Sequence, residues 1–190
     1  MLAISITSCQ KSFEFSDPDI DERELMKSFT KYHIPQGKQY AENNTPIAVD
    51  RQELKFQVRF DNSAIYKTAD PSNQDDINKL YGFSDNSAQH HQFSARIGWR
   101  WSGDSLRLFA YIYNNSVRIS DEITTVAIGK INDCSIKVNG NRYIFTVNNS
   151  TILMPRAATT PQASGYKLYP YFGGDEVAPH DIDIWIKEVF

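Results

Sequence analysis

Hydrophobic and polar residues alternate with a period of two along much of the chain. In "ELKFQVRF", residues 53–60, the four apolar side chains share one face of an extended chain and the other side chains share the opposite face. This pattern is typical of an antiparallel strand with one buried face. Further runs of the same kind predict strands at 93–101, 106–113, 134–147 (a pair) and 181–189.

Turn and capping residues mark the ends of these runs. The dipeptide NG at 139–140 separates two alternating runs and predicts a tight hairpin, and GD at 103–104 predicts another tight turn. Two short helices are also predicted. "SDPDIDERELMKSFTKY", residues 16–32, opens with capping residues and a proline suited to a first helical turn. "SNQDDINKLYGF", residues 72–83, has capping residues and a glycine suited to a helix end.

About nine or ten short strands with two minor helices predict an all-β domain. No unit repeats at a fixed period, which argues against a solenoid or a propeller. We therefore expect a two-sheet antiparallel β-sandwich of the jelly-roll type over residues 46–190. An eight-stranded lipocalin-type barrel is the alternative fold that the same pattern allows.

Composition narrows the class of protein. The chain has 190 residues and a formal net charge of −3, so nothing in its overall charge points to nucleic acid as a partner. Aromatic residues make up 13% of the chain, which suits strands. No apolar stretch is long enough to predict a transmembrane helix. Cys134 lies in the alternating run "CSIKV" and is predicted to be a small buried core residue.

The N-terminal residues carry a different signal. "ITSC", residues 6–9, resembles the lipobox of bacterial lipoproteins, in which the cysteine becomes lipidated. The preceding eight residues lack the charged region and the length of a complete signal peptide. We interpret 1–9 as a truncated lipoprotein signal with Cys9 as the lipidation site, and 10–45 as tether, short helix and loop. A lipid anchor at Cys9 would place the protein in the cell envelope, on the outer membrane or secreted. A chance cysteine in a frayed N-terminus is the alternative.

The predicted hairpin 93–113 concentrates charges and rings on one face. Its inward residues are apolar, and its outward residues form what we call the Arg/Tyr face: Arg96, Arg100, Arg107, Phe109, Tyr111 and Tyr113. Opposite residues on a sheet face lie roughly 5 Å apart, so these side chains would form one platform. Arginine pairs with carboxylates and sulfates, and tyrosine offers a ring and a hydroxyl. The face is therefore a candidate glycan-binding groove, unless the second sheet covers it.

Two other segments hold candidate chemistry. His90 and His91 enter the strand, and on an extended chain they would point to opposite faces, which disfavours a shared metal. A Ca²⁺ site is conceivable from Asp175, Glu176 and Asp181, but their spacing matches no EF-hand, and a plain glycine turn before the last strand explains the run better. We therefore predict no cofactor.

Enzyme motifs are mostly absent: the chain has no G-x-S-x-G, P-loop or H-E-x-x-H sequence. A polysaccharide lyase needs less, namely a residue that neutralises a uronate and a base such as His or Tyr. The candidates for catalysis are His90, His91, Tyr111 and Tyr113.

Three runs carry a resemblance to a known group: "GWRW", "YPYFGG" and "APHDIDIWI". With them, residues 50–190 resemble small concanavalin A-like jelly-roll surface lipoproteins of polysaccharide-degrading Gram-negative bacteria. The resemblance implies a β-sandwich and a polysaccharide partner. Alginate-lyase members carry Gln-Ile-His and Tyr-Phe-Lys-Ala-Gly segments, where this chain has "AQHH" and "YPYFGG". No catalytic residue therefore carries over.

Three functional hypotheses follow. The first is a lipid-anchored β-sandwich that binds a polysaccharide or oligosaccharide through Arg96, Arg100, Arg107, Tyr111 and Tyr113. The second is a polysaccharide lyase that acts on an acidic polysaccharide in the same groove. The third is a structural or assembly lipoprotein whose rings contact an envelope protein partner. The fold alone does not choose among them.

Overall fold

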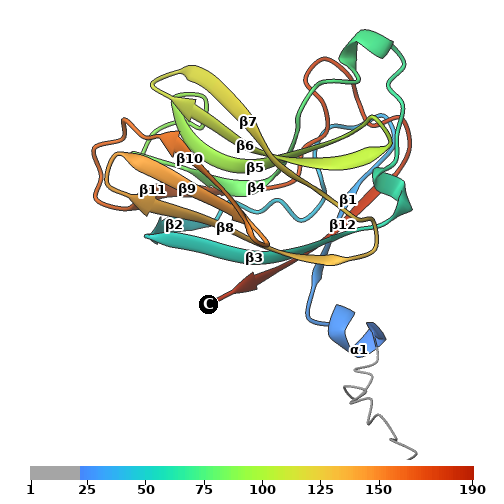
Figure 1. The fold of residues 1–190 in the computed structure, drawn as a ribbon, viewed down its shortest axis with the longest axis horizontal. Coiled ribbons are helices and arrows are strands. Elements are labelled where there is room, and N and C mark those ends of the chain that lie inside the picture. The colour runs from blue at the N-terminus through green and yellow to red at the C-terminus, as the bar shows by residue number, and fades with distance from the viewer. Residues whose placement is uncertain (1–21) are drawn as a thin grey trace, which may run out of the picture.

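A computed structural model describes residues 22–190 of the chain and shows two antiparallel sheets packed face to face. The back sheet has the strand order β1-β12-β3-β8-β9-β10, and the front sheet has the order β2-β11-β4-β5-β6-β7. In Figure 1 the strands β5, β6 and β7 lie above β3 and β8. The sheets are separate and each has two edges, so the jelly-roll prediction is confirmed and the alternative barrel is wrong.

The elements follow one another with short connections. The back-sheet strands are β1 (Thr30–Ile34), β3 (Glu53–Phe60), β8 (Ile131–Asn139), β9 (Arg142–Val147), β10 (Ser150–Pro155) and β12 (Ile182–Val189). The front-sheet strands are β2 (Ala48–Arg51), β4 (Asn78–Ser84), β5 (Phe93–Ser102), β6 (Ser105–Asn114), β7 (Val117–Val126) and β11 (Ala163–Leu168). The described helical elements are α1 (Glu22–Met26) and the 3₁₀ turns η1 (Asn62–Ala64) and η2 (Pro71–Asn73). None of these helices is long and apolar enough to cross a membrane.

The core fills the space between the sheets and follows the predicted alternation. In β3, Leu54, Phe56, Val58 and Phe60 are all buried, and the residues between them are not. Cys134 is also buried in this core, as predicted, and burial raises the pKa of its thiol.

The strands β5 and β6 form the predicted hairpin, and its register places Arg96 opposite Tyr111 and Arg100 opposite Arg107. Its turn residues Gly103 and Asp104 both have a positive φ, of 56° and 53°. This is the backbone that a two-residue type I′ turn requires.

Both helix predictions need correction. Of the helix expected over 16–32, the described part forms α1 and then the strand β1, which pairs with β12. The helix expected over 72–83 is instead the single turn η2 followed by β4, a strand near the middle of the front sheet. Six of the seven residues of β4 are buried, so the strand shows no alternation that sequence could reveal.

A buried ion pair joins the sheets at one end of the sandwich. Asp85 follows β4 in the front sheet and Arg156 follows β10 in the back sheet, and their side chains are 0% and 2% exposed. Arg156 Nε donates to Asp85 Oδ2 at 2.8 Å, and the hydroxyl of Tyr143 on β9 donates to the same oxygen at 2.6 Å. The pair is therefore fully hydrogen-bonded, which a buried carboxylate requires.

Candidate functional site

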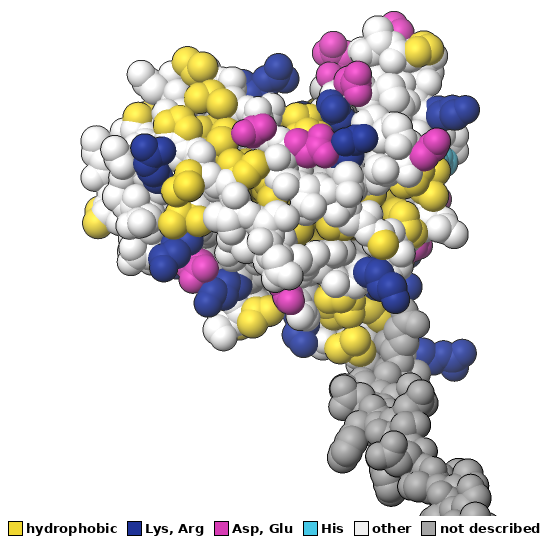
Figure 2. Space-filling model, in the orientation of Figure 1, with side chains coloured by type: hydrophobic (Ala, Val, Ile, Leu, Met, Phe, Trp, Pro, Cys, Tyr) yellow, Lys and Arg dark blue, Asp and Glu magenta, His cyan; other side chains and the backbone are white. Residues whose placement is uncertain are grey.

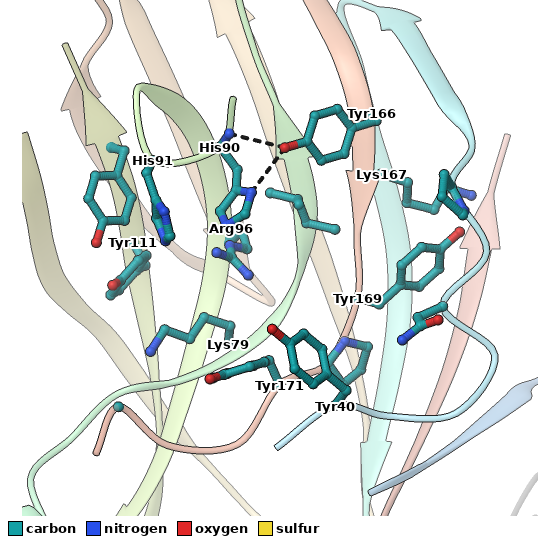
Figure 3. A pocket seen from close by; sticks show the side chains of 16 residues that line it. Tyr40, Lys79, His90, His91, Arg96, Tyr111, Tyr166, Lys167, Tyr169 and Tyr171 are labelled. Carbon is teal, nitrogen blue, oxygen red and sulfur yellow. Dashed lines mark hydrogen bonds between the residues drawn. The ribbon is translucent and has the colours of Figure 1, made fainter. Parts of the chain in front are cut away.

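A pocket of about 590 Å³ opens on the outer face of the front sheet, on the side of β5 and β6 opposite the core. This volume is in the range of small-molecule sites in proteins. Side chains from β4, β5, β6 and β11, from the turn before β5 and from the loops around residues 40–46 and 169–174 surround it (Figure 3). Six tyrosines line it: Tyr40, Tyr111, Tyr113, Tyr166, Tyr169 and Tyr171.

Apart from the tyrosines, the ionisable side chains of the pocket are all basic. Lys79, Arg96, Lys167, His90 and His91 line it, and no aspartate or glutamate does so within residues 22–190. Lys167 is already engaged, since its Nζ forms an ion pair with Glu188. The remaining lysine and the arginine make the pocket attractive to an anion.

Arg96 lies at the centre of this site in Figure 3, and it is buried. Its Nε is buried without a hydrogen-bond partner, and no ion pair joins it to an acid among the described residues. Burial lowers the pKa of its guanidinium, while the surrounding tyrosines act in the opposite direction. A buried cation without a counter-charge is costly, so Arg96 is suited to meeting an anionic ligand.

Lys79 on β4 provides the second cation. Its ammonium lies 5.4 Å from the ring centroid of Tyr111 and 5.6 Å from that of Tyr171, and it donates to the Gly173 carbonyl at 2.8 Å. Burial, and then the charge of Arg96, lower the pKa of Lys79 to about 8. At neutral pH the pocket therefore holds two nearby positive charges.

His90 is held against the opposite wall by Tyr166 on β11. The backbone N–H of His90 donates to the Tyr166 hydroxyl oxygen at 3.1 Å, and His90 Nδ1 lies 2.9 Å from the same oxygen (dashed lines in Figure 3). Burial, followed by the charge of Arg96 and by His91, lowers the pKa of His90 to about 4. His90 is therefore a neutral imidazole at neutral pH.

The prediction that His90 and His91 point to opposite faces is wrong. They lie in a turn rather than an extended strand, and their ring centroids are 4.2 Å apart. The ring of His91 also contacts that of Tyr113, with centroids 5.1 Å apart.

Tyr111 contributes a neutral hydroxyl group to the pocket. Burial raises the pKa of Tyr111 to about 12, so its hydroxyl stays protonated. Both histidines and both tyrosines thus line one pocket.

The Arg/Tyr face divides into two parts. Arg96, Tyr111 and Tyr113 line the pocket, but Arg100 and Arg107 do not. Arg100 Nη1 donates to the Asp75 carbonyl at 2.6 Å, and its guanidinium carbon lies 4.8 Å from the Phe109 ring centroid. Arg107 Nη1 is 2.9 Å from Glu122 Oε1.

Acidic side chains gather at the corner around η2, the upper right of Figure 2. The second sheet packs on the other side of β5 and β6, so it leaves this face open.

Two of the three carboxylates considered for Ca²⁺ accept hydrogen bonds from separate backbone groups. Glu176 accepts from the backbone N–H groups of Ala69 and Asp70 at 2.9 and 2.7 Å, and Asp181 accepts from that of Gln36 at 2.8 Å. Residues 22–190 contain no group of three or more His, Cys, Asp or Glu side chains placed to hold a metal ion. Gly173 has a positive φ of 79°, as the glycine turn required.

Of the sixteen residues that line the pocket, the sequence analysis identified five, namely His90, His91, Arg96, Tyr111 and Tyr113. Lys79 lies in a segment predicted to be helical, Tyr166 was not identified as a candidate, and Tyr171 entered only through the "YPYFGG" run of the family resemblance. One signal was present in the sequence: the run "YKLYPY", residues 166–171, has three tyrosines in six residues, and Pro170 interrupts the strand pattern between the last two. Cys9 and its predicted lipidation lie outside the described residues.

No protein-family model matches the sequence, and a search of curated proteins finds no match. Solved structures share the fold. Alginate lyase AlyC3 superposes with a TM-score of 0.58 at 10% identity, over 86% of this chain and 75% of that one. LamAcat from Zobellia galactanivorans gives 0.52 at 11% identity, over 83% and 74%. The endo-β-1,3(4)-glucanase SCLam gives 0.50 at 10% identity, over 75% and 57%. These similarities confirm the concanavalin A-like jelly-roll fold that the resemblance implied.

Proposed function

We propose that this chain is a polysaccharide-binding or polysaccharide-processing jelly-roll protein, and that it binds an acidic polysaccharide in the pocket on the front sheet. The observation that carries the proposal is Arg96, a buried guanidinium that faces a solvent-accessible pocket and has no acidic partner within residues 22–190. A carboxylate or sulfate on a sugar would supply that partner in a charge-assisted hydrogen bond.

The rest of the pocket supports the same ligand class. Lys79 adds a second positive charge, and Tyr111 and Tyr113 offer rings and hydroxyl groups for a sugar. The absence of carboxylates among the described lining residues removes a source of repulsion toward an anion. An alginate lyase and a glucanase share the fold at low identity, which is consistent with a polysaccharide ligand but does not choose one.

Affinity electrophoresis tests the proposal. The protein would be run through native gels that contain polyuronates, sulfated glycans or neutral glucans. We expect retarded mobility in at least one acidic gel, and loss of that retardation in Arg96→Gln. The matched control is Arg107→Gln, which removes an arginine of the same strand face that lies outside the pocket. Equal mobility of wild type in all gels would refute binding and would favour the structural or assembly hypothesis.

A second candidate is a polysaccharide lyase, and the position of neutral His90 favours it. When Tyr166 donates its proton to Gln89 Oε1, at 3.3 Å, His90 Nδ1–H donates to Tyr166 and Nε2 keeps a lone pair. Nε2 would take the proton from the uronate carbon that bears the carboxylate, and Arg96 would stabilise the charge of that carboxylate. The carbon–carbon double bond forms as the β carbon–oxygen bond breaks, and the leaving oxygen takes the proton of Tyr113.

The two candidates differ in what Tyr113→Phe and His90→Gln do. A lyase releases unsaturated product, detected by ultraviolet absorbance, and these variants lose turnover while they keep retardation in the gel. A binding protein forms no product with any polymer.

We also propose that a lipid on Cys9 anchors the domain in the cell envelope. The support is the "ITSC" sequence alone. Labelling cells with a radioactive fatty acid tests it, because Cys9→Ser should abolish the label and move the protein out of the membrane fraction. Label that persists in Cys9→Ser would contradict the assignment.

A further inference from the structure

Tyr40 stands out among the tyrosines of the pocket because it is exposed. Its relative exposure is 66%, whereas Tyr111 is buried and the other four are half-buried. Exposed large hydrophobic residues elsewhere in 22–189 are aliphatic. An exposed ring at the edge of a polar pocket is a group that a ligand can cover.

The structure holds this ring in place. Tyr40 bridges to Tyr171, and the Ala41 backbone N–H donates to the Pro170 carbonyl at 3.2 Å. The Phe172 backbone N–H donates to the Gln39 carbonyl at 2.8 Å, so the chain on both sides of Tyr40 is fixed. The two rings meet nearly at right angles, at 83° with centroids 4.8 Å apart. Figure 3 shows both rings together at one end of the pocket, beyond Lys79.

This edge-to-face contact leaves Tyr40 with a flat face free. Tyr171 uses its ring to contact both Tyr40 and the ammonium of Lys79. From the centre of the pocket outward, the order is therefore the cation Arg96, the cation Lys79, the ring of Tyr171 and the open ring of Tyr40. The charge needed for an anion lies at the inner end of this series, and an uncharged aromatic surface lies at its outer end.

We propose that Tyr40 forms a second sugar subsite, which stacks on the apolar face of the sugar next to the one whose anionic group meets Arg96. This inference rests on the proposed function. The ligand is then a chain of at least two sugars, and a free acidic monosaccharide fills only the inner half of the site. Stacking would bury apolar ring surface on both partners, which favours binding without adding charge.

The experiment compares affinity as a function of ligand length. Mannuronate, dimannuronate and tetramannuronate are the first probes, replaced by the matching oligomers of whichever acidic polymer retards the protein most. Isothermal titration would be done with wild type, Tyr40→Ala, Tyr40→Phe and Arg96→Gln. Leu153→Ala is the matched control, because Leu153 is also exposed, at 56%, but lies on β10 of the back sheet.

Tyr40→Ala should weaken the tetrasaccharide about tenfold, which corresponds to about 1.4 kcal/mol, and leave the monosaccharide unchanged. Tyr40→Phe keeps the ring and should bind like wild type, as should Leu153→Ala. Equal weakening of both lengths, or of neither, in Tyr40→Ala overturns the second subsite. If Arg96→Gln leaves all affinities unchanged, the proposed function itself fails. Thermal unfolding of each variant would show that Tyr40→Ala is folded, as its exposure predicts.

Discussion

Replacing Arg96 with methionine is expected to stabilise the ligand-free protein while it abolishes glycan binding. Arg96 is 7% exposed, its Nε has no partner, and burial lowers the pKa of its guanidinium. A buried polar group left without a hydrogen bond costs about 1–3 kcal/mol. Methionine fills a similar volume without that cost, so Arg96→Met should raise the free energy of unfolding by about 1–3 kcal/mol.

Arg156 provides the control, because it is 4% exposed and yet fully paired. Arg156→Met would leave the carboxylate of Asp85 buried without its counter-charge. Removing one partner of a buried pair costs about 3–5 kcal/mol. The same substitution at two buried arginines should therefore change stability in opposite directions. For a chain of this size the melting temperature moves by about 2–4 °C per kcal/mol.

Urea unfolding followed by tryptophan fluorescence measures both changes, since Trp99 lies in the core. The titration is repeated with an acidic polysaccharide that retards wild type. Saturating ligand should stabilise wild type, by about 2.7 kcal/mol at a hundred times Kd, and should leave Arg96→Met unchanged. A destabilised Arg96→Met in the absence of ligand would refute the reasoning, because it would mean that Arg96 serves the fold and not a ligand.

Three further predictions concern charge and packing. Because the pKa of Lys79 is lowered to about 8, affinity for an acidic polysaccharide in the gel assay should fall several-fold as the pH rises through 8, and Lys79→Arg should remove this fall. Burial raises the pKa of Asp85, but the bonds from Arg156 and Tyr143 outweigh it and lower the pKa overall. The stability that Asp85 contributes is present above its unfolded pKa of 3.8 and is lost as the pH falls through the lower folded value. Tyr143→Phe removes one of the bonds that lower this pKa, so it should be less stable than wild type by about 1.5–3 kcal/mol at neutral pH. Urea titrations should therefore show that wild type loses more stability on acidification than Tyr143→Phe does. A Cβ on Gly82 would lie 2.1 Å from the backbone oxygen of Ala95, so Gly82→Ala should lower the melting temperature and cost at least about 1–3 kcal/mol.

The alternation in the sequence was enough to predict the strands that have one buried and one solvated face. β3 and the hairpin β8–β9 are of this kind. In the hairpin β5–β6 both faces are largely buried, but the alternation of residue types still marked the strands, and the turns of both hairpins have the residues that tight turns require. β4 was missed because the capping residues and the glycine of 72–83 matched the pattern of a short helix, and six of the seven residues of the strand are buried, so buried and solvated positions do not alternate. That signal was real, but it specified only one 3₁₀ turn.

The site was predicted in part for a similar reason. The register of one hairpin placed Arg96 opposite Tyr111, and this needed only local information. The separation of Arg96 from Arg100 depends on Asp75, which a distant loop brings to the second arginine and not to the first. Tyr40 and Tyr166 reach the pocket from segments more than a hundred residues apart, and strand order cannot be read from a single sequence.

The order of the back sheet bears on how this domain is made. β12 lies between β1 and β3, so the strand that is made after the other eleven described strands is an interior strand of its sheet. Until it inserts, neither β1 nor the edge of β3 that faces away from β8 is paired with a described strand. β11, which carries Tyr166, likewise joins two strands made far earlier, β2 and β4. Because each non-local pairing needs both of its strands, folding of the described domain cannot complete until β11 and β12 have been synthesised, and the pocket is among the last features to form.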